Sequence, residues 1–172
     1  MSTRAPYTVL FLCTGNSARS ILGEYLLRAR GHGRFETFSA GSHPTGKVNP
    51  LAQQVLSTHY GIDATTARSK SSEEFRDRKF DFVITVCDHA REACPYWPGQ
   101  PIIAHWGSPD PAHVQGTEEQ RLRAFVDVAS QIDSRIKVFC AFRDEQLDEM
   151  QVRSVGEQFK LDPAQTTWGS PK

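Results

Sequence analysis

The sequence predicts an α/β protein built on a four-stranded parallel sheet with helices on both faces. Short apolar runs alternate along the chain with longer stretches in which apolar residues recur every three or four positions. The apolar runs are almost uninterrupted, as in strands that are covered on both faces. Alternation of this kind favours parallel strands joined by helical crossovers. The predicted strands are 7–12, 35–39, 80–86 and 102–106.

The helical stretches carry their own start and stop signals. Pro50 fits the first turn of a helix, and Gly61 fits its end. Thr117 and Gln120 form the pattern of a capping box in front of a long amphipathic stretch. The predicted helices are 18–30, 50–61, 73–78, a long helix after Thr117 and a further one beyond Phe142.

Length and composition indicate one domain with an ordinary core. The chain has 172 residues, and Lys plus Arg equals Asp plus Glu at 20 each, so no bulk charge favours nucleic acid or a membrane surface. No apolar run is as long as a membrane span, and the N-terminus lacks a signal-peptide core. We expect a cytoplasmic monomer with a single domain over 1–142, followed by an extension over 143–172 that forms a helix and a flexible tail.

The cysteines and histidines do not form the usual structural patterns. Four cysteines in a chain of this length do not suggest a disulfide framework. No Cys-x-x-Cys pair is present, and the six histidines are scattered, so a zinc site is not expected. Free, chemically active thiols are the remaining interpretation.

The stretch 9–20 is the centre of the functional argument. An apolar strand ends at Cys13, a short loop leads to Arg19 and Ser20, and a helix begins there. Such a turn directs backbone N–H groups at one point beside a helix N-terminus, which favours an oxyanion, and Arg19 adds a planar fork of donors. We expect Cys13 to be a stabilised thiolate aimed at the central atom of a bound tetrahedral anion. The alternative is a small buried cysteine without chemistry.

Two further candidates follow predicted strands, at the sheet edge where ligands bind in such folds. Cys87 follows the third strand, and Asp110 lies in the loop after the fourth, between Pro109 and Pro111. We expect Asp110 to be a general acid that protonates a leaving oxygen. An ordinary turn aspartate is the alternative, since prolines favour one there.

These residues resemble a known family. The loop from Cys13 to Ser20 is similar to the active-site loop of the low-molecular-weight protein tyrosine phosphatases and of the arsenate reductases built on that Rossmann-like scaffold. The loop alone does not separate the two activities. The segment from Cys87 to Cys94 resembles the redox segment of thioredoxin-coupled arsenate reductases, and the surroundings of Asp110 are also closer to the reductases. The resemblance covers most of residues 7–140.

The resemblance implies reduction of arsenate to arsenite by three thiols. Cys13 attacks arsenic, Cys87 attacks the sulfur of Cys13, and Cys94 attacks Cys87. Thioredoxin reduces the resulting disulfide, and no cofactor is required. The implied catalytic residues are Cys13, Cys87, Cys94, Arg19, Asp110 and Ser20, and the implied substrate-binding residues are Thr14, Gly15, Asn16, Ser17, Ala18 and Arg19.

The chain departs from the family pattern in two places. Ala18 stands where the reductases frequently carry a cysteine. Asn16, Glu24 and Ser39 match a potassium site of some members, but Ser71 stands where a carboxylate would be expected. We therefore expect no tight metal site.

Three alternatives remain open at the level of sequence. One is a tyrosine phosphatase, and a weak phosphatase side activity is expected in any case because phosphate and arsenate share shape and charge. A second is a reductase recycled by glutaredoxin or a small thiol. A third is a protein that only binds arsenic through soft thiol ligands.

Overall fold

The computed structural model describes residues 4–92, 97–99 and 101–147, and Cys94 lies outside the described residues. Within them, four strands form one sheet in the order β2-β1-β3-β4, and every neighbouring pair is parallel. This confirms the predicted sheet. The strands are β1 (Tyr7–Cys13), β2 (Phe35–Gly41), β3 (Phe82–Thr85) and β4 (Ile102–His105).

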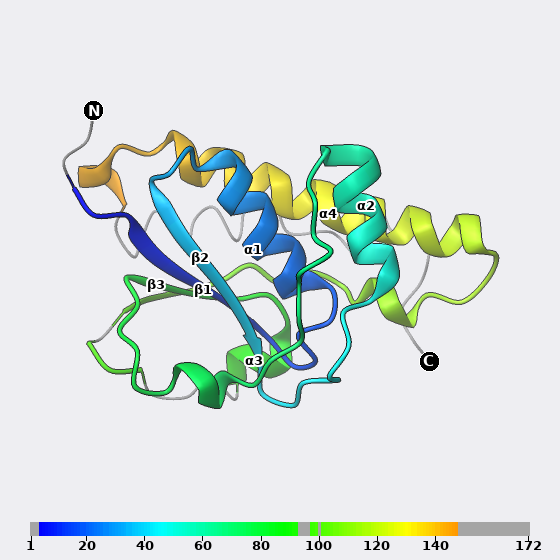
Figure 1. Cartoon of the computed structure of the whole chain (residues 1–172), viewed down its shortest axis with the longest axis horizontal. Helices are drawn as coiled ribbons and strands as arrows, with labels where there is room; N and C mark the ends of the chain where they lie inside the picture. The colour runs from blue at the N-terminus through cyan, green and yellow to red at the C-terminus, as the bar shows by residue number, and fades with distance from the viewer. Residues whose placement is uncertain (1–3, 93–96, 100, 148–172) are drawn as a thin grey trace.

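The helices cover both faces of this sheet, as predicted. Three long helices pack against one another on one side, and Figure 1 shows them together above the strands. The smaller elements η1 and α3 lie on the other side (Figure 1). The helices are α1 (Arg19–Arg30), α2 (Pro50–Tyr60), α3 (Asp88–Glu92) and α4 (Glu118–Ala141), with single 3-10 turns at η1 (Ser72–Phe75), η2 (Pro111–His113) and η3 (Asp144–Gln146).

The helix boundaries have the predicted chemistry. The Asn49 side chain accepts a hydrogen bond from the Leu51 N–H, and Gly61 ends α2 with a left-handed φ of 65°. At the start of α4 the Thr117 hydroxyl accepts from the Gln120 N–H at 3.1 Å, while the Gln120 side chain accepts from the Thr117 N–H at 2.9 Å. This reciprocal pair is the expected capping box.

Two predicted elements differ in extent from the observed ones. The third strand is shorter than predicted because Phe80 packs edge-on against Phe38, Phe75 and Trp97 instead of joining the ladder. The predicted helix at 73–78 is a single 3-10 turn, which begins where the Ser71 hydroxyl accepts from the Glu73 N–H at 3.2 Å.

Tight packing fixes the position of α1 over β1. A Cβ atom on Gly23 would lie 2.6 Å from the ring of Phe11, so only glycine allows this approach. Farther along the same face, Phe139 of α4 contacts Phe35 and Phe82. The start of α1, and with it the loop after β1, is therefore held against the sheet.

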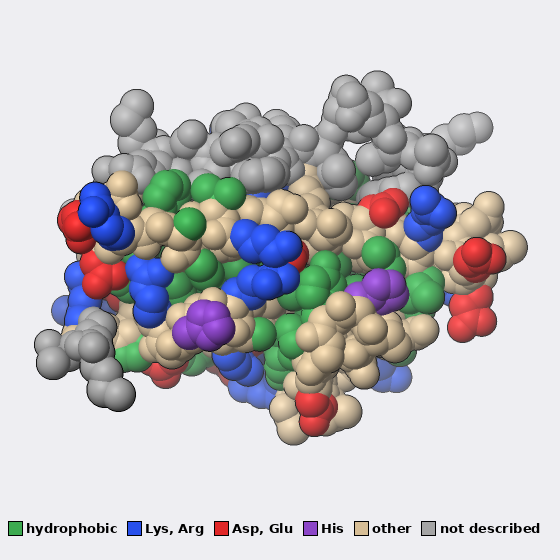
Figure 2. Space-filling view, turned by 90° about the horizontal axis from the view of Figure 1, so that it is seen from above, with side chains coloured by type: hydrophobic (Ala, Val, Ile, Leu, Met, Phe, Trp, Pro, Cys, Tyr) green, Lys and Arg blue, Asp and Glu red, His purple; other side chains and the backbone are tan. Residues whose placement is uncertain are grey.

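The surface has mixed charge. Seen from the side of the long helices, Lys and Arg side chains alternate with Asp and Glu among hydrophobic ones (Figure 2). Within the described part of the chain, no helix is long and apolar enough to cross a membrane. The strongest local field is therefore expected at the strand ends.

Candidate active site

The loop from Cys13 to Ser20 is clamped through its carbonyl groups by the segment 42–49. Ser42 N donates to Cys13 O at 3.2 Å, His43 N to Thr14 O at 2.9 Å, Thr45 N to Gly15 O at 3.0 Å and Asn49 N to Ser17 O at 2.8 Å. In a trans peptide the N–H points away from the carbonyl of the same unit. The N–H groups that follow these carbonyls are therefore turned away from the clamping segment.

The inward side of the loop is a set of donors around the cysteine. Asn16 N donates to Cys13 Sγ at 3.1 Å, which shows that this N–H faces the thiol. Within the described residues, no acceptor is paired with the N–H of Gly15, Ser17 or Ala18. Helix α1 begins after Ala18 without a side-chain cap, so its first N–H groups also remain for an anion.

Two backbone features give the loop this shape. Asn16 has a φ of 47°, in the left-handed region that asparagine tolerates better than most residues. Gly41, at the end of β2, lies under the loop, and a Cβ atom there would be 2.5 Å from Thr14 O. A larger residue at position 41 would push the loop out of place.

Cys13 is buried and hydrogen-bonded. Its Sγ atom lies 2.9 Å from Ser20 Oγ, and the residue is 4% exposed. Burial is the largest influence and raises the pKa of the Cys13 thiol, while Ser20, the Arg19 guanidinium and the Asn16 N–H lower it in that order. The net effect is a raised pKa, because desolvation outweighs the donors. The prediction of a stabilised thiolate is therefore wrong.

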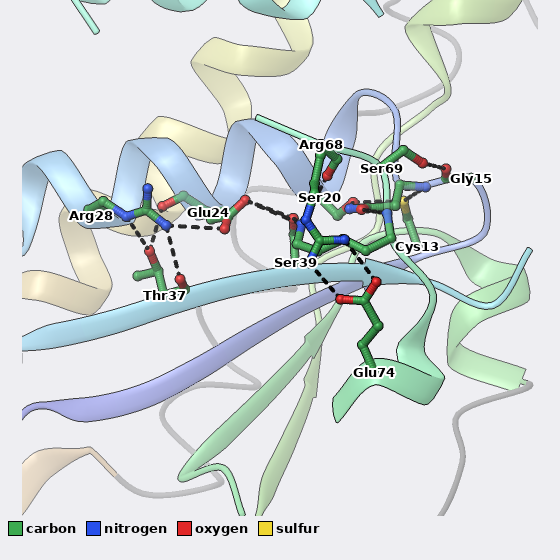
Figure 3. A network of polar contacts seen from close by, with 12 residues as sticks. Cys13, Gly15, Ser20, Glu24, Arg28, Thr37, Ser39, Arg68, Ser69 and Glu74 are labelled. Atoms are coloured by element: carbon green, nitrogen blue, oxygen red, sulfur yellow. Dashed lines mark hydrogen bonds and ion pairs between the residues drawn. The ribbon is translucent and has the colours of Figure 1, made fainter. Parts of the chain in front are cut away.

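Asn16 connects the loop to its supports. Its side-chain amide donates to Ser20 Oγ at 2.8 Å, and its Oδ1 accepts from the Lys70 N–H at 2.8 Å. Figure 3 shows Ser69 beside Gly15, close to Cys13. The side chain of Asn16 thus bridges the loop and the segment around Lys70.

Cys87 lies close to the loop. Strands β1 and β3 are neighbours, with Leu12 opposite Thr85, so Cys13 ends β1 and Cys87 lies two residues after the end of β3. Cys87 Sγ is 3.5 Å from the hydroxyl of Thr14, and Cys87 is buried. The structure therefore brings together two of the three predicted thiols, and the third, Cys94, lies outside the described residues.

Arg19 and Asp110 meet beside the loop. Arg19 Nη1 donates to Ser108 O at 2.8 Å, and Arg19 Nη2 lies 3.4 Å from Asp110 Oδ2. The Asp110 carboxylate also accepts from the Ala112 N–H at 3.0 Å and lies 3.4 Å from His113 Nε2. Asp110 is thus held against the arginine that the sequence predicts to bind the anion.

Arg135 is a residue that the sequence analysis missed. It is fully buried on α4, and its guanidinium donates to Trp106 O at 2.9 Å and Gly107 O at 3.0 Å. It also lies 3.2 Å from Ser108 Oγ. Arg135 therefore fixes the loop that carries Asp110. A charged residue on the apolar side of a predicted helix is the signal that could have revealed it.

The residues considered for potassium surround a lysine. Ser39 Oγ donates to Glu24 Oε2 at 2.8 Å, and Lys70 Nζ lies 3.1 Å from Ser39 Oγ. Ser71, at the position where a carboxylate would be expected, caps η1 instead. Among the described residues, no group of three or more His, Cys, Asp and Glu side chains could hold a metal ion.

The fourth cysteine is remote from this chemistry. Cys140 lies on α4 among core residues, and burial raises the pKa of its thiol to about 11. A thiol with that pKa is almost wholly protonated near neutral pH and is a poor nucleophile. Cys140 therefore takes no part in this site.

A cysteine and an arginine that flank an anion-binding turn, with an aspartate on a late loop, define the phosphatase-type site of this fold. The family model described as low molecular weight phosphotyrosine protein phosphatase matches residues 8–153, and the chain belongs to this family.

Within this family, the chain is similar in sequence and in structure to several arsenate reductases. It is 37% identical over 131 residues to an arsenate reductase of Halalkalibacterium halodurans, covering 76% of this chain and 93% of that protein. A structure titled "An arsenate reductase in the phosphate binding state" matches with a TM-score of 0.64 and 27% identity over 78% of this chain and 97% of the other. A thioredoxin-dependent arsenate reductase of Corynebacterium glutamicum matches with a TM-score of 0.57 and 28% identity, covering 79% of this chain and 61% of that one.

Proposed function

We propose that this protein reduces arsenate to arsenite by a relay of three cysteines. The observation that carries the proposal is the second thiol: Cys87 Sγ lies 3.5 Å from the hydroxyl of Thr14, beside the loop that begins at Cys13. A phosphatase of this fold needs only one cysteine, because water hydrolyses its phosphocysteine. Two electrons for arsenate have to come from a second thiol within reach of the first.

Binding and the first chemical step use the loop. Arsenate is held by the N–H groups of residues 14–19 and by the Arg19 guanidinium, which exchanges its contact with Ser108 O for the anion. Cys13 Sγ forms a bond to arsenic while an arsenic–oxygen bond breaks. Asp110 gives its proton to the departing hydroxide of the dianionic substrate, which leaves as water. The thiol proton of Cys13 restores the proton on Asp110, and an arsenocysteine remains.

The redox step transfers an electron pair to arsenic. The thiolate of Cys87 attacks Cys13 Sγ, the sulfur–arsenic bond breaks, and its electron pair stays on arsenic, which leaves as arsenite. A disulfide between Cys13 and Cys87 is the oxidised product. Cys13 is the last residue of β1, and Cys87 lies two residues after the end of the neighbouring parallel strand β3. Neighbouring strands run about 4.8 Å apart, so we expect the two thiols to come within the Cα separation that a disulfide allows.

Recycling requires the third thiol and a partner. Cys94 attacks Cys87 and frees Cys13, and a dithiol protein of the thioredoxin type reduces the Cys87–Cys94 bond. The thioredoxin-dependent protein of Corynebacterium glutamicum supports this choice of partner. Glutaredoxin or a small thiol is the alternative reductant.

Phosphate-ester hydrolysis is the second candidate function. The family to which the chain belongs is named for it, and the loop accepts any tetrahedral oxyanion of suitable size. We propose it as a weak side activity, because the second thiol has no role in hydrolysis.

Arsenate-dependent oxidation of NADPH, coupled through thioredoxin and thioredoxin reductase, tests the proposal. We expect turnover that requires arsenate and that phosphate does not replace. The same assay with glutathione and glutaredoxin identifies the partner. Rapid ester hydrolysis without arsenate-dependent NADPH oxidation by any of these thiol systems would show that the chain is a phosphatase.

A further inference from the structure

Lys70 places a buried ammonium group behind the catalytic loop. The residue is 9% exposed, although lysine is rarely buried without a partner. Its Nζ donates to Ser39 Oγ at 3.1 Å and to Arg68 O at 3.0 Å, and lies 4.0 Å from Glu24 Oε2. A hydroxyl, a backbone carbonyl and a carboxylate thus surround one positive charge.

The same residue supports the loop through its backbone. The Lys70 N–H donates to Asn16 Oδ1 at 2.8 Å, and Lys70 O accepts from the Gly41 N–H at 2.9 Å. Its neighbour Ser69 donates through its hydroxyl to Gly15 O at 3.1 Å. Figure 3 shows the contacts at both ends of this network, from Glu24 and Ser39 to Ser69 and Gly15. The segment that carries the ammonium therefore holds two residues of the loop.

A short path leads from this segment to the nucleophile. Asn16, held by Lys70, donates to Ser20 Oγ at 2.8 Å, and Ser20 Oγ lies 2.9 Å from Cys13 Sγ. The position of Lys70 thus determines the position of the side chain that orients the hydroxyl on the thiol. A shift of Asn16 would be transmitted to Cys13 through a single residue.

We propose that Lys70 is a positioning residue for the chemistry of Cys13, and that its ammonium serves as a built-in monovalent cation between Glu24 and Ser39. The proposal rests on the proposed function in one respect, that Cys13 is the nucleophile. It implies that the loop keeps its shape without any free cation.

The charge balance around Glu24 explains why a cation is needed there. The Glu24 side chain is 8% exposed, and an isolated buried carboxylate is costly. Arg28 contacts Glu24 Oε1 at 3.1 Å, but it does so from a side chain that is 49% exposed. Lys70 neutralises the other oxygen from inside. Burial is the largest influence on Lys70 and lowers the pKa of its ammonium group, while the nearby Glu24 carboxylate opposes this effect.

A tethered ammonium has an advantage over a free ion. Because the cation is covalently linked, its local concentration is fixed by the chain and does not depend on the solution. Carbonyl and hydroxyl oxygens such as those of Arg68 and Ser39 are also the kind of ligand that replaces the hydration shell of potassium. Removing the lysine side chain should therefore leave a site that potassium can enter.

The experiment compares Lys70→Ala, Lys70→Met and an exposed control, Lys79→Ala, with and without potassium at constant ionic strength. The readouts are hydrolysis of p-nitrophenyl phosphate and the pH dependence of Cys13 alkylation by iodoacetamide, followed by mass spectrometry. Neither readout uses arsenate or Cys87. If ester hydrolysis and Cys13 alkylation behave as expected but the protein does not turn over arsenate, the proposed function is refuted and this inference still stands.

We expect the wild type and Lys79→Ala to be indifferent to potassium. Lys70→Ala should lose about tenfold in kcat, since a misplacement of about 1 Å can cost 10²-fold, and potassium should restore most of it while moving the alkylation profile back. In Lys70→Met the methionine fills the space of the lysine side chain without its charge, so this variant should lose activity that potassium does not restore. Thermal unfolding of each variant shows whether the fold is retained.

Three outcomes would overturn the inference. The first is a wild-type rate that rises with potassium, which would mean that Lys70 does not fill the site. The second is a folded Lys70→Met with wild-type kcat and alkylation profile, because the charge would then be irrelevant. The third is a folded Lys70→Ala that neither potassium nor methylammonium restores, since the site would then not be one for a cation.

Discussion

The two cysteine segments follow neighbouring strands and are held very differently. The loop after Cys13 has four carbonyls bound by the segment 42–49, and further support from Ser69 and Lys70. In the described part of the segment after Cys87, Ala90 N donates to Cys87 Sγ at 3.3 Å and Arg91 N to Cys87 O at 3.1 Å, and Asp88 contacts His105 Nε2 at 3.0 Å. The first segment is held through its backbone by distant parts of the fold, whereas these backbone contacts of the second are local.

This difference matches two kinds of chemistry. An anion site works best when its donors are already in place, because no reorganisation is then needed during the reaction. A thiol that passes on a disulfide has to change partners. Helix α3 has 5 residues, and a helix of this length has little stability of its own. In a helix, a rise of 1.5 Å per residue would put the Cα atoms of Cys87 and Cys94 about 10 Å apart, beyond the disulfide limit of about 7 Å, so we predict that formation of this disulfide unwinds α3.

The largest expected effect separates the two thiols by activity. Cys13→Ser should abolish arsenate reduction and ester hydrolysis, because both begin with attack by Cys13. Cys87→Ser should abolish repeated arsenate turnover but retain ester hydrolysis, because only electron transfer uses Cys87. Steady-state rates of both reactions on both variants provide the measurement. Arsenate turnover by Cys87→Ser with thioredoxin would contradict the assignment of the second thiol.

The next largest effect concerns the acid. Asp110→Asn should slow the chemical step by about 10²–10⁴, the usual contribution of general acid catalysis. Phosphate should still bind, because the loop donors and Arg19 are unchanged, and its affinity can be measured by calorimetry. A parallel loss of affinity and rate would indicate that Asp110 acts mainly by holding Arg19, at 3.4 Å, in place.

Much of the fixed region could be predicted from the sequence. A strand, a turn with an arginine and a helix start are all local patterns, and the neighbouring positions of Cys13 and Cys87 follow from two strand ends in a parallel sheet. The roles of Lys70 and Arg135 could not be predicted with the same ease. Lys70 lies in a polar stretch that reads as an ordinary loop, and its inward direction depends on Glu24 and Ser39, which are distant in the sequence.

The pKa of Cys13 shows a second limit of sequence reasoning. The donors that lower it are visible as a motif, whereas the burial that raises it depends on how β1 is covered by α1 and the surrounding loops. Desolvation is a property of the whole fold. A local motif can therefore identify the groups around a thiol, but it does not show whether their combined effect raises or lowers the pKa of that thiol.

A third test removes one donor from Cys13. Ser20→Ala should raise the pKa of the Cys13 thiol further, because the Ser20 hydroxyl at 2.9 Å stabilises the thiolate. A hydrogen bond to a charged group contributes about 1.5–3 kcal/mol, so the thiolate fraction at a given pH below the pKa should fall by about ten- to a hundredfold. The pH dependence of Cys13 alkylation measures it, with Ser130→Ala as an exposed control. A profile that does not move would mean that Ser20 does not donate to the thiolate.

The stability that follows from this pKa has a definite sign. A raised pKa in the folded state stabilises the fold fully below the ordinary cysteine pKa, about 8.5, and this contribution is lost as the pH rises through the folded value. The free energy of unfolding should therefore fall above about pH 8.5. Chemical denaturation of Cys13→Ser beside the wild type isolates the contribution of Cys13, and equal slopes with pH would refute it.

The smallest expected effect concerns the segment after Cys87. Asp88, the first residue of α3, contacts His105 Nε2 at 3.0 Å, and His105 Nδ1 lies 2.8 Å from Thr85 Oγ1, so this chain of contacts ties α3 to β4. The Asp88 side chain is 85% exposed, and exposed ion pairs contribute about 0.2–1 kcal/mol. Asp88→Asn should therefore increase opening of α3 by about two- to fivefold, as one kcal/mol corresponds to a factor of about five.

Amide exchange of α3 and alkylation of Cys87 measure this opening, and the same data report on the loop of Cys13. We expect faster exchange in α3 and faster alkylation of Cys87, with no change at Cys13, because the clamp from residues 42–49 does not involve Asp88. Equal acceleration at both cysteines would mean that the two segments open together. The loop of Cys13 and the segment of Cys87 would then not move independently, and the relay would require a concerted movement of both.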